Sequence, residues 1–488
     1  MNKPIRTMSI FCLLLFTALL LNSTYLQYVD AGSLNSRADN KRVRDAEFSR
    51  KRGAIVADGT SVAESQKTSD QYVYQRVYQQ PLKYAQLTGY YSYVYGRSGV
   101  ESSENEILSG SDPRLFVNRV VDLLGNSQPK GGSVSLTVDR EAQNAAYDGL
   151  RALGENVEGS VVALQPSTGK ILAMVSSPTY DPNLLASHKF SDVQRSWAQL
   201  NGSEDRPMLN RGIQEVYPPG STFKLVTAAA ALSSGQYTPD TIVQGGTRLD
   251  LPQTSTDLVN DGGSNCGGNR ITLTKALEVS CNVSFGGIGL RLGGDALREQ
   301  AEKFGFGQTY LNDLNGQVRS RFPEDPDEPQ TALSAIGQFD VAATPLQMAM
   351  VGAGIANGGT VMRPYLVDEV RAPDLSVLDK TKPEAYRSNA ISSAVSRDLT
   401  QMMIEVVDQG TASTAQIPGV KVAGKTGTAQ SSPERPPYAW FVSFAPADNP
   451  AVAVAVLVED AGVARNAISG SGLAAPIAKR VMQAVMAR

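Results

Sequence analysis

Apolar and polar residues follow three kinds of pattern along this chain of 488 residues. Residues 10–21 are almost all apolar, and weaker apolar character continues to Val29. The stretch 8–29 has the length of one membrane span, which needs about 20 residues. A cleaved signal peptide is the alternative. Because no small-x-small cleavage site follows the stretch, the pattern favours an uncleaved anchor.

Beyond the anchor, the pattern predicts one sheet built from two distant parts of the chain. Short apolar runs at 161–164 and 171–175 flank a Pro-Ser-Thr-Gly turn, which is typical of a β-hairpin. Further strands are expected from 420 and at 438–444 and 451–458. Helical spacing predicts helices at 139–153 and 475–486, and a mostly helical region fills 191–357. This order predicts an α/β (α+β) core, an antiparallel sheet flanked by helices, with an all-α lobe inserted.

The segment between the anchor and residue 155 predicts a second, smaller α+β domain. It begins with a charged stalk at 37–52. A strand with a tight turn is expected at 52–59, and a β-leaning part rich in Tyr and Val at 72–95. A helix at 112–124 and a Gly/Pro-rich linker at 128–133 follow. We therefore expect a tail at 1–8, an anchor at 9–29, a stalk with a membrane-proximal domain at 30–155, and the main domain at 156–488.

Composition narrows the function. The net charge is −3, and the few aromatic residues are not interleaved with basic clusters, so no nucleic-acid partner is expected. The one histidine, His188, lies in a polar stretch. With three cysteines and one histidine, the chain lacks the ligands of a structural zinc site, and we expect neither a metal nor a cofactor.

Ser221 and Lys224 form a candidate nucleophile and base. A serine hydroxyl needs a base to react at neutral pH, and a lysine three residues later lies on the same face of a helix. The same S-x-x-K spacing occurs at Ser127 and Ser167, but only Ser221 precedes an expected helix. There it would meet unpaired backbone N–H groups. The alternative for Ser221 is a plain helix N-cap.

Two later motifs strengthen the interpretation of Ser221 as a nucleophile. Ser280-Cys281-Asn282 follows it, and Lys425-Thr426-Gly427-Thr428 lies on the strand expected from Val420. Serine with S-x-x-K, then S-x-N, then K-T-G, resembles the signature of the penicillin-recognising serine acyltransferases.

Longer stretches resemble the class B penicillin-binding proteins. The short membrane-proximal domain and the Ser-Cys-Asn motif look like the penicillin-binding protein A branch. The matching stretches are Arg52-Gly53-Ala54-Ile55, Asn210-Arg211, Tyr217 to Lys224, Ala335-Ile336-Gly337-Gln338, Thr344-Pro345-Leu346-Gln347 and Ala356-Asn357-Gly358-Gly359.

The resemblance implies the penicillin-binding, β-lactamase-like transpeptidase fold and a D,D-transpeptidase that cross-links peptidoglycan. Such an enzyme cleaves the D-Ala-D-Ala end of a stem peptide, forms an acyl-enzyme on the serine and passes it to an amine. It also implies covalent inhibition by β-lactams, septal or cell-shape wall synthesis, and a polytopic glycan polymerase as partner.

The resemblance also assigns roles to the motif residues. Lys224 would be the neutral base, with its pKa lowered by burial and by Lys425. Ser280 would relay a proton, and Asn282 would hold Lys224 and the substrate amide. Gly427 would let the strand approach the substrate. The side chains of Lys425, Thr426 and Thr428 would bind the terminal carboxylate of the substrate. The backbone N–H groups of Ser221 and Thr428 would form the oxyanion hole.

Cys266 and Cys281 raise the question of a disulfide. Cys12 falls in the apolar segment, whereas these two flank a Gly/Asn-rich turn and a short amphipathic segment. Outside the cytoplasm they can pair, with a gain of about 3 kcal/mol for a loop of this size. Two free thiols are the alternative.

The sequence supports two membrane orientations and several alternative functions. Basic residues after the span outnumber Lys3 and Arg6, so the positive-inside rule alone would place the main domain in the cytoplasm. The implied chemistry instead predicts a single-pass protein of the bacterial membrane with an extracytoplasmic main domain. A D,D-carboxypeptidase, a β-lactam sensor and a noncatalytic wall-binding scaffold are the alternatives. A class A β-lactamase is disfavoured, since no E-x-x-L-N segment follows the middle motif.

Overall fold

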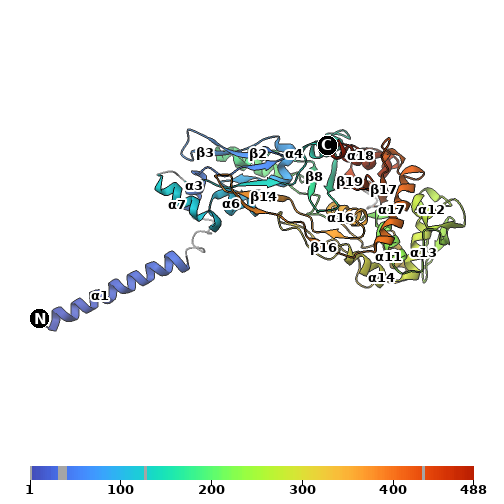
Figure 1. The fold of residues 1–488 in the computed structure, drawn as a ribbon, viewed down its shortest axis with the longest axis horizontal. Coiled ribbons are helices and arrows are strands. Elements are labelled where there is room, and N and C mark those ends of the chain that lie inside the picture. The colour runs from blue at the N-terminus through green and yellow to red at the C-terminus, as the bar shows by residue number, and fades with distance from the viewer. Residues whose placement is uncertain (1–2, 31–40, 126–128, 431–434, 488) are drawn as a thin grey trace.

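The computed structural model describes residues 3–30, 41–125, 129–430 and 435–487. The molecule is elongated, with an apolar helix at one end, a small domain beside it and a larger domain beyond (Figure 1). Helix α1 (Lys3–Thr24) continues into a π-helical turn, η1 (Tyr25–Val29), and none of its residues is buried. Its mean hydropathy is 2.0, and it is the one helix in the described ranges that is long and apolar enough to cross a membrane.

The larger domain is built on a five-stranded antiparallel sheet in the order β17-β18-β19-β7-β8. Its first two strands in sequence form the predicted hairpin, and the other three come from the end of the chain. The strands are β7 (Glu158–Leu164), β8 (Ile171–Ser177), β17 (Ala423–Ala429), β18 (Tyr438–Ala445) and β19 (Val452–Asp460). The predicted antiparallel sheet is therefore confirmed, but its K-T-G strand begins at Ala423 and not at Val420.

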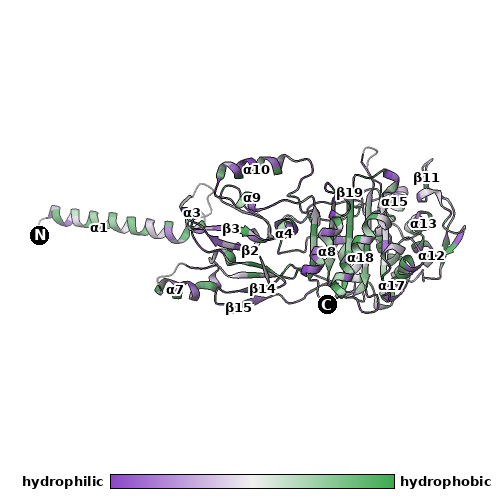
Figure 2. Ribbon diagram, turned by 90° about the horizontal axis from the view of Figure 1, so that it is seen from above, coloured by the Kyte–Doolittle hydropathy of each residue, from purple (hydrophilic) through white to green (hydrophobic). Residues whose placement is uncertain are grey.

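Helices cover both faces of this sheet, which explains why β18 and β19 are almost continuously buried. Helices α8 (Arg140–Arg151) and α18 (Ala475–Met486) pack against each other and the sheet, as Figure 2 shows, while α16 (Pro345–Ala356) packs on β19 and β7. Asp139 caps α8 by accepting from the Ala142 N–H at 2.8 Å. Thr344 caps α16, as its Thr-Pro start predicts.

The helical lobe lies between the two halves of the sheet in sequence. It contains short two-stranded pieces besides the expected helices. The helices of the lobe are α11 (Lys224–Ser233), α12 (Leu273–Glu278), α13 (Asn282–Leu292), α14 (Gly294–Lys303), α15 (Glu328–Ser334) and α17 (Ser393–Asp408). Helices α9 (Asn183–Ala186) and α10 (Phe190–Gly202) belong to the same part of the sequence but pack beside the membrane-proximal domain (Figure 2). The strands are β9 (Ile242–Gln244), β10 (Arg248–Asp250), β11 (Asp257–Val259), β12 (Arg270–Thr272), β13 (Val361–Met362) and β16 (Ala385–Arg387).

The membrane-proximal domain has a six-stranded sheet in the order β15-β14-β6-β1-β2-β3. Its last two strands in sequence arrive from more than 200 residues further along the chain. The strands are β1 (Ile55–Ala57), β2 (Thr60–Lys67), β3 (Tyr74–Tyr78), β6 (Ser133–Leu136), β14 (Val367–Arg371) and β15 (Val377–Lys380). The remaining elements are α3 (Lys41–Phe48), α4 (Pro81–Thr88), β4 (Tyr91–Ser92), β5 (Gly96–Arg97), α5 (Gly99–Ser103), α6 (Asn105–Ser109), the 3₁₀ turn η2 (Pro113–Leu115) and α7 (Phe116–Leu124).

The structure adds detail to three local expectations for this domain. The Tyr/Val-rich part contains β3 and β4, as its composition predicts, but also α4, which Pro81 begins at the first helical position. The stalk contains α3, although residues 37–40 lie outside the described ranges. The Gly/Pro-rich segment is no linker where it is described, because a Cβ on Gly131 would lie 1.8 Å from the Leu108 carbonyl oxygen. That glycine is therefore required by close backbone packing.

A buried ion cluster fixes the centre of the membrane-proximal domain. The fully buried Glu101 accepts from Arg52 Nε at 2.6 Å and from Arg76 Nε at 2.5 Å. Burial raises the pKa of Glu101, but the two guanidinium groups outweigh it and hold the pKa below its ordinary value. The cluster joins β3, α5 and the residues before β1.

We predict that Glu101→Gln lowers the free energy of unfolding of this domain by about 3–5 kcal/mol, because it leaves two buried cations without their anion. Thermal or urea unfolding of the purified protein measures the change. The matched control is Glu299→Gln, which removes one partner of an exposed ion pair with Lys303. Equal unfolding of the two variants would contradict the structural role of the cluster.

Candidate active site

Ser221 lies in a 3₁₀ turn, η3 (Gly220–Phe223), directly before α11. It therefore precedes the helix, as predicted, although the α-helix proper begins only at Lys224. Gly220 has φ +51°, and its N–H donates to the Gly337 carbonyl at 3.0 Å. Trp440 Nε1 donates to the Pro218 carbonyl at 2.9 Å, which ties the turn to the sheet. The residues just before the serine are thus held by one backbone and one side-chain hydrogen bond.

Lys224 is fully buried and points at the middle motif. Its Nζ donates to the Ser280 carbonyl at 2.6 Å and to Asn282 Oδ1 at 2.7 Å, and lies 3.3 Å from Ser280 Oγ. Burial lowers the pKa of Lys224 well below its ordinary value, and the charge of Lys425 lowers it further, while Asp261 raises it. A lysine in this environment sheds its proton far more readily than one in water.

Lys425 reaches the same hydroxyl from the sheet. Its Nζ donates to Ser280 Oγ at 2.8 Å and to the Thr426 carbonyl at 2.9 Å. Burial lowers the pKa of Lys425 to about 7. Ser280 thus lies between two lysines that come from α11 and β17, and the structure brings all three predicted motifs together.

Ser280 occupies the short connection between α12 and α13, with φ +60°. A non-glycine residue with positive φ is uncommon and costs about 1 kcal/mol or more. Asn282 is the first residue of α13, and its Nδ2 donates to the Val259 carbonyl at 3.0 Å. The strained connection aims the side chains of the motif toward the lysines.

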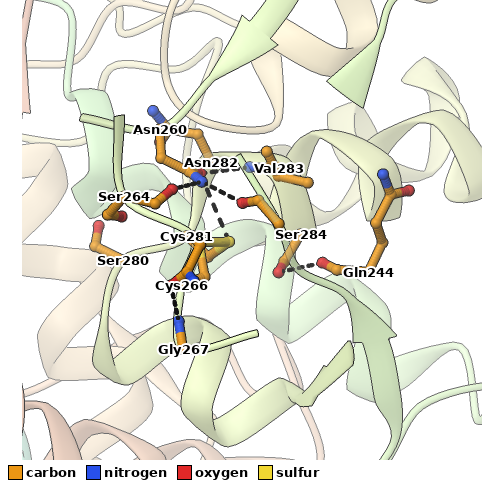
Figure 3. The surroundings of a disulfide bond; sticks show 12 residues. Gln244, Asn260, Ser264, Cys266, Gly267, Ser280, Cys281, Asn282, Val283 and Ser284 are labelled. Atoms are coloured by element: carbon orange, nitrogen blue, oxygen red, sulfur yellow. Dashed lines mark hydrogen bonds between the residues drawn. A yellow bond between two sulfur atoms is a disulfide. The ribbon is translucent and has the colours of Figure 1, made fainter. Parts of the chain in front are cut away.

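A disulfide joins Cys281 to Cys266, as predicted, with the two Cα atoms 5.6 Å apart (Figure 3). Asn260 reinforces the link: its Oδ1 accepts from the Val283 N–H at 3.0 Å, and its Nδ2 donates to the Gly246 and Ser264 carbonyls at 2.7 Å each. The loop at 260–268 is thereby fastened to the middle motif. Nothing in the sequence motif alone points to Asn260.

Gly427 serves packing as well as the site. A Cβ here would lie 2.9 Å from Thr222 Cγ2 and 3.1 Å from the Pro219 carbonyl oxygen. The close approach that the sequence analysis assigned to a substrate is therefore also an approach to the turn that carries Ser221. The glycine lets β17 lie directly against that turn.

The motifs open into a cleft of about 910 Å³. Ser221, Ser280, Asn282, Thr426 and Thr428 line it, together with residues that sequence reasoning missed. The missed lining residues include Asp257, Asn260, Asp261, Gln338, Phe339, Thr411, Gln430 and the loop at 469–471. Of these, Thr411 shares a 2.6 Å hydrogen bond with Thr426 between their hydroxyls. Apart from Gln338, which ends the Ala335–Gln338 stretch, none of them belongs to a stretch that the sequence analysis singled out.

Neither Ser167 nor the histidine lines this cleft. Lys170, the partner of Ser167 in its S-x-x-K match, pairs with Asp368 at 2.8 Å beside the β7–β8 turn. Ser127 lies outside the described residues. His188 Nδ1 is 2.5 Å from Asp70 Oδ2 and its ring packs on Tyr72 in the membrane-proximal domain. The arrangement around the cleft can therefore perform Ser/Lys acyl transfer. Lys224, whose pKa is lowered, is the candidate base.

We predict that alkylation of the unreduced, unfolded protein modifies Cys12 alone, whereas prior reduction exposes all three thiols, because Cys266 and Cys281 are bonded. Mass spectrometry of the alkylated peptides measures this. The Cys266→Ser variant is the control and leaves Cys281 reactive without reduction. Modification of both cysteines in unreduced wild-type protein would contradict the bond.

Comparison with known proteins gives a consistent picture. Residues 159–483 match the family model described as penicillin binding protein transpeptidase domain, and residues 52–134 match the penicillin binding protein A dimerisation domain. The chain is 43% identical, over 100% of its length and 99% of the relative's, to a protein of Mycolicibacterium smegmatis named peptidoglycan D,D-transpeptidase PbpA. It is 42% identical to the Mycobacterium tuberculosis protein of the same name, over 100% of this chain and 99% of the relative.

Solved structures agree. The ceftriaxone acyl-enzyme complex of penicillin-binding protein A from M. tuberculosis has a TM-score of 0.87 at 42% identity, and the match covers 91% of this chain and 100% of that one. PBP2 of Pseudomonas aeruginosa, in complex with WCK 5153, has a TM-score of 0.73 at 30% identity, with 89% and 95% covered. The chain belongs to the penicillin-binding protein transpeptidase family.

Proposed function

We propose that this chain is a peptidoglycan D,D-transpeptidase that forms its acyl-enzyme on Ser221. The observation that carries the proposal is that Ser221 and Ser280 line one cleft, while the buried Lys224 and Lys425 both reach Ser280. Relatives that match over the full length carry the transpeptidase name, and one homologous structure is an acyl-enzyme. The enzyme takes stem peptides as donor and acceptor, and β-lactams react with the same serine.

In the acylation step, neutral Lys224 accepts the proton of the Ser221 hydroxyl as the oxygen attacks the donor carbonyl. The burial of Lys224 and the charge of Lys425 favour the neutral form. The backbone N–H groups of Ser221 and Thr428 stabilise the developing oxyanion. The C–N bond to the terminal D-Ala breaks, and that amine needs a proton in order to leave.

Ser280 supplies the path for that proton. Its Oγ is 3.3 Å from Lys224 Nζ and 2.8 Å from Lys425 Nζ, so a proton can pass from a lysine through the hydroxyl to the leaving amine. Asn282 holds Lys224 and the substrate amide. In the second step the proton transfers are reversed. The acceptor amine loses its proton to these groups while it attacks the ester carbonyl.

The terminal carboxylate of the substrate binds to residues of the K-T-G strand, β17. Thr426 and Thr428 offer hydroxyl groups in the cleft, and Lys425 contributes charge when it is protonated. Thr411 orients Thr426 through their shared hydrogen bond. We assign Thr411 as a positioning residue for this subsite.

The proposed topology follows from the substrate, which lies outside the membrane. Residues 1–8 are cytoplasmic, residues 9–29 span the bilayer, and the membrane-proximal part (30–155) and the transpeptidase part (156–488) are extracytoplasmic. The apolar helix at Lys3–Val29 supports an anchor. A polytopic glycan polymerase as a membrane partner, and a role in septal or cell-shape synthesis, rest on the family resemblance.

We predict that Ser221→Ala loses covalent labelling by fluorescent penicillin and lowers transpeptidation by more than about 10³-fold, because the attacking oxygen is gone. Gel fluorescence and mass spectrometry of the adduct measure labelling, and chromatography of cross-linked and trimmed stem peptides measures turnover. Ser167→Ala is the matched control and keeps both activities. Persistent labelling of Ser221→Ala would rule out this nucleophile, and release of D-Ala without cross-links would identify a carboxypeptidase.

We predict that Asp261→Asn moves the acidic limb of the acylation pH profile to lower pH. Asp261 raises the pKa of Lys224, so its removal lowers that pKa and extends the neutral, basic form to more acidic solutions. Stopped-flow acylation by a chromogenic β-lactam measures the limb.

The control for this experiment is Asp250→Asn, an exposed carboxylate in β10. It should leave the profile unchanged. A shift of the Asp261→Asn limb to higher pH, or no shift, would mean that Lys224 does not set this limb.

A further inference from the structure

Helix α7 is fastened to the protein by its polar side. Asn118 Nδ2 donates to Asp374 Oδ2 at 3.2 Å, in the turn between β14 and β15. Arg119 donates to the carbonyl groups of Gly110 and Ser111 at 3.1 and 2.7 Å. Among the described side chains of this helix, Asn118 and Arg119 make the hydrogen bonds to the rest of the domain.

The opposite side of α7 is apolar and faces outward. Phe116, Val120, Val121 and Leu124 are 62%, 37%, 62% and 83% exposed. Val120, Val121 and Leu124 follow Phe116 by four, five and eight residues, which places all of them on one face. A helix on the surface of a globular domain normally does the reverse and turns its apolar stripe to the core. We call these four residues the outward face of α7.

A second exposed apolar segment lies next to this helix. Leu375 and Val377, in the β14–β15 turn and at the start of β15, are 67% and 52% exposed. The Asn118–Asp374 hydrogen bond links the turn to α7, although the two are about 250 residues apart in sequence. A clustered apolar surface of this kind marks a contact with another apolar phase or molecule.

The position of α7 indicates which phase that is. Figures 1 and 2 both show α7 and α3 at the end of the molecule nearest to α1. Ten residues, 31–40, connect the apolar helix to α3. A chain of that length spans at most about 35 Å. The anchor therefore holds this end of the domain close to the bilayer at high effective concentration.

Three exposed basic residues lie near the segment that holds Arg119. Arg50, Lys51 and Lys130 are exposed. The Gly131 N–H donates to the Lys51 carbonyl, and the backbone of Lys130 lies against Gly110, one of the residues that hold Arg119. Cations beside an apolar helical face suit the phospholipid headgroup region, where each adds about 1 kcal/mol of attraction to anionic lipid.

The outward face alone is too small for a stable contact with a second copy, although the domain that carries it matches a family model named for dimerisation. Nine residues make a helix about 14 Å long. Four side chains along that length, with two more on the neighbouring turn, fall well short of the roughly 800 Å² per partner of a stable protein interface. A bilayer needs no such complementary area from a partner protein.

We propose that α7 is an interfacial helix whose outward face inserts into the headgroup–acyl boundary of the bilayer that holds the anchor. The inference rests on the proposed topology. Its consequence is that the membrane-proximal domain is attached at two places, by α1 and by α7. The direction of the long axis of the molecule from the membrane is then fixed.

The test uses the full chain, with Cys12→Ala, in nanodiscs that hold one copy each. An environment-sensitive fluorophore is attached through Val121→Cys, and lipids that carry nitroxide near the headgroup serve as quenchers. We expect the Val121 probe to lose more than half of its emission. The matched control is Ile242→Cys, 47% exposed in β9 of the helical lobe, which should not be quenched.

A second pair of variants separates lipid contact from misfolding. With the probe moved to Val120→Cys, the double change Val121→Asp and Leu124→Asp should abolish quenching at an unchanged melting temperature. Solvent-exposed emission from Val121 in the discs would overturn the proposal. A parallel set of discs is loaded with two copies each; shielded but unquenched emission in these discs alone would assign the face to a second copy and would also overturn the proposal.

The same discs keep the proposals distinguishable. Flotation of the same variant after reconstitution into vesicles tests the anchor, and labelling by fluorescent penicillin in the discs tests Ser221. If both succeed while the Val121 probe stays unquenched, the inference about α7 fails alone.

Discussion

The active site depends on the burial of two lysines around one hydroxyl group. Lys224 and Lys425 are both fully buried, and both reach Ser280 Oγ. No carboxylate accepts a hydrogen bond from either ammonium group in the described structure, and Asp261 acts only from the exposed rim of the cleft. Two uncompensated cations this close favour the loss of a proton.

Bringing these groups together requires close backbone contacts between four segments. Gly220 contacts Gly337 and Ala429, Gly427 contacts the turn of Ser221, and Gly470 lies against the Trp440 and Gly427 backbone. A side chain at any of these points would push the segments apart. The positive φ of Ser280 stores additional strain at the same place. The site is stiff because the sheet, α11 and the middle motif share one junction, and stiffness keeps the proton path short.

The sequence predicted those features that local patterns encode. The hairpin at 160–175, the last helix, the Thr344 cap and the order of the three motifs are all visible in spacing and residue type. Helix α4 was missed because the tyrosines and valines around it suggested strands, although Pro81 marked its start. The return of β14 and β15 was missed because pairing between distant strands leaves no local pattern. Thr411 and Asp261 were missed for the same reason, since only the fold brings them to the cleft.

That return of β14 and β15 has a consequence for the order of folding. Strand β6 pairs with β1 on one side and with β14 on the other, and β14 lies more than 200 residues later in the chain. During synthesis, the N-terminal half of the small sheet therefore waits with an open edge while most of the larger domain is made. An open strand edge is a template for wrong pairing. The part of the molecule that emerges first is thus completed late, and a chain cut short before residue 367 would leave both domains unfinished.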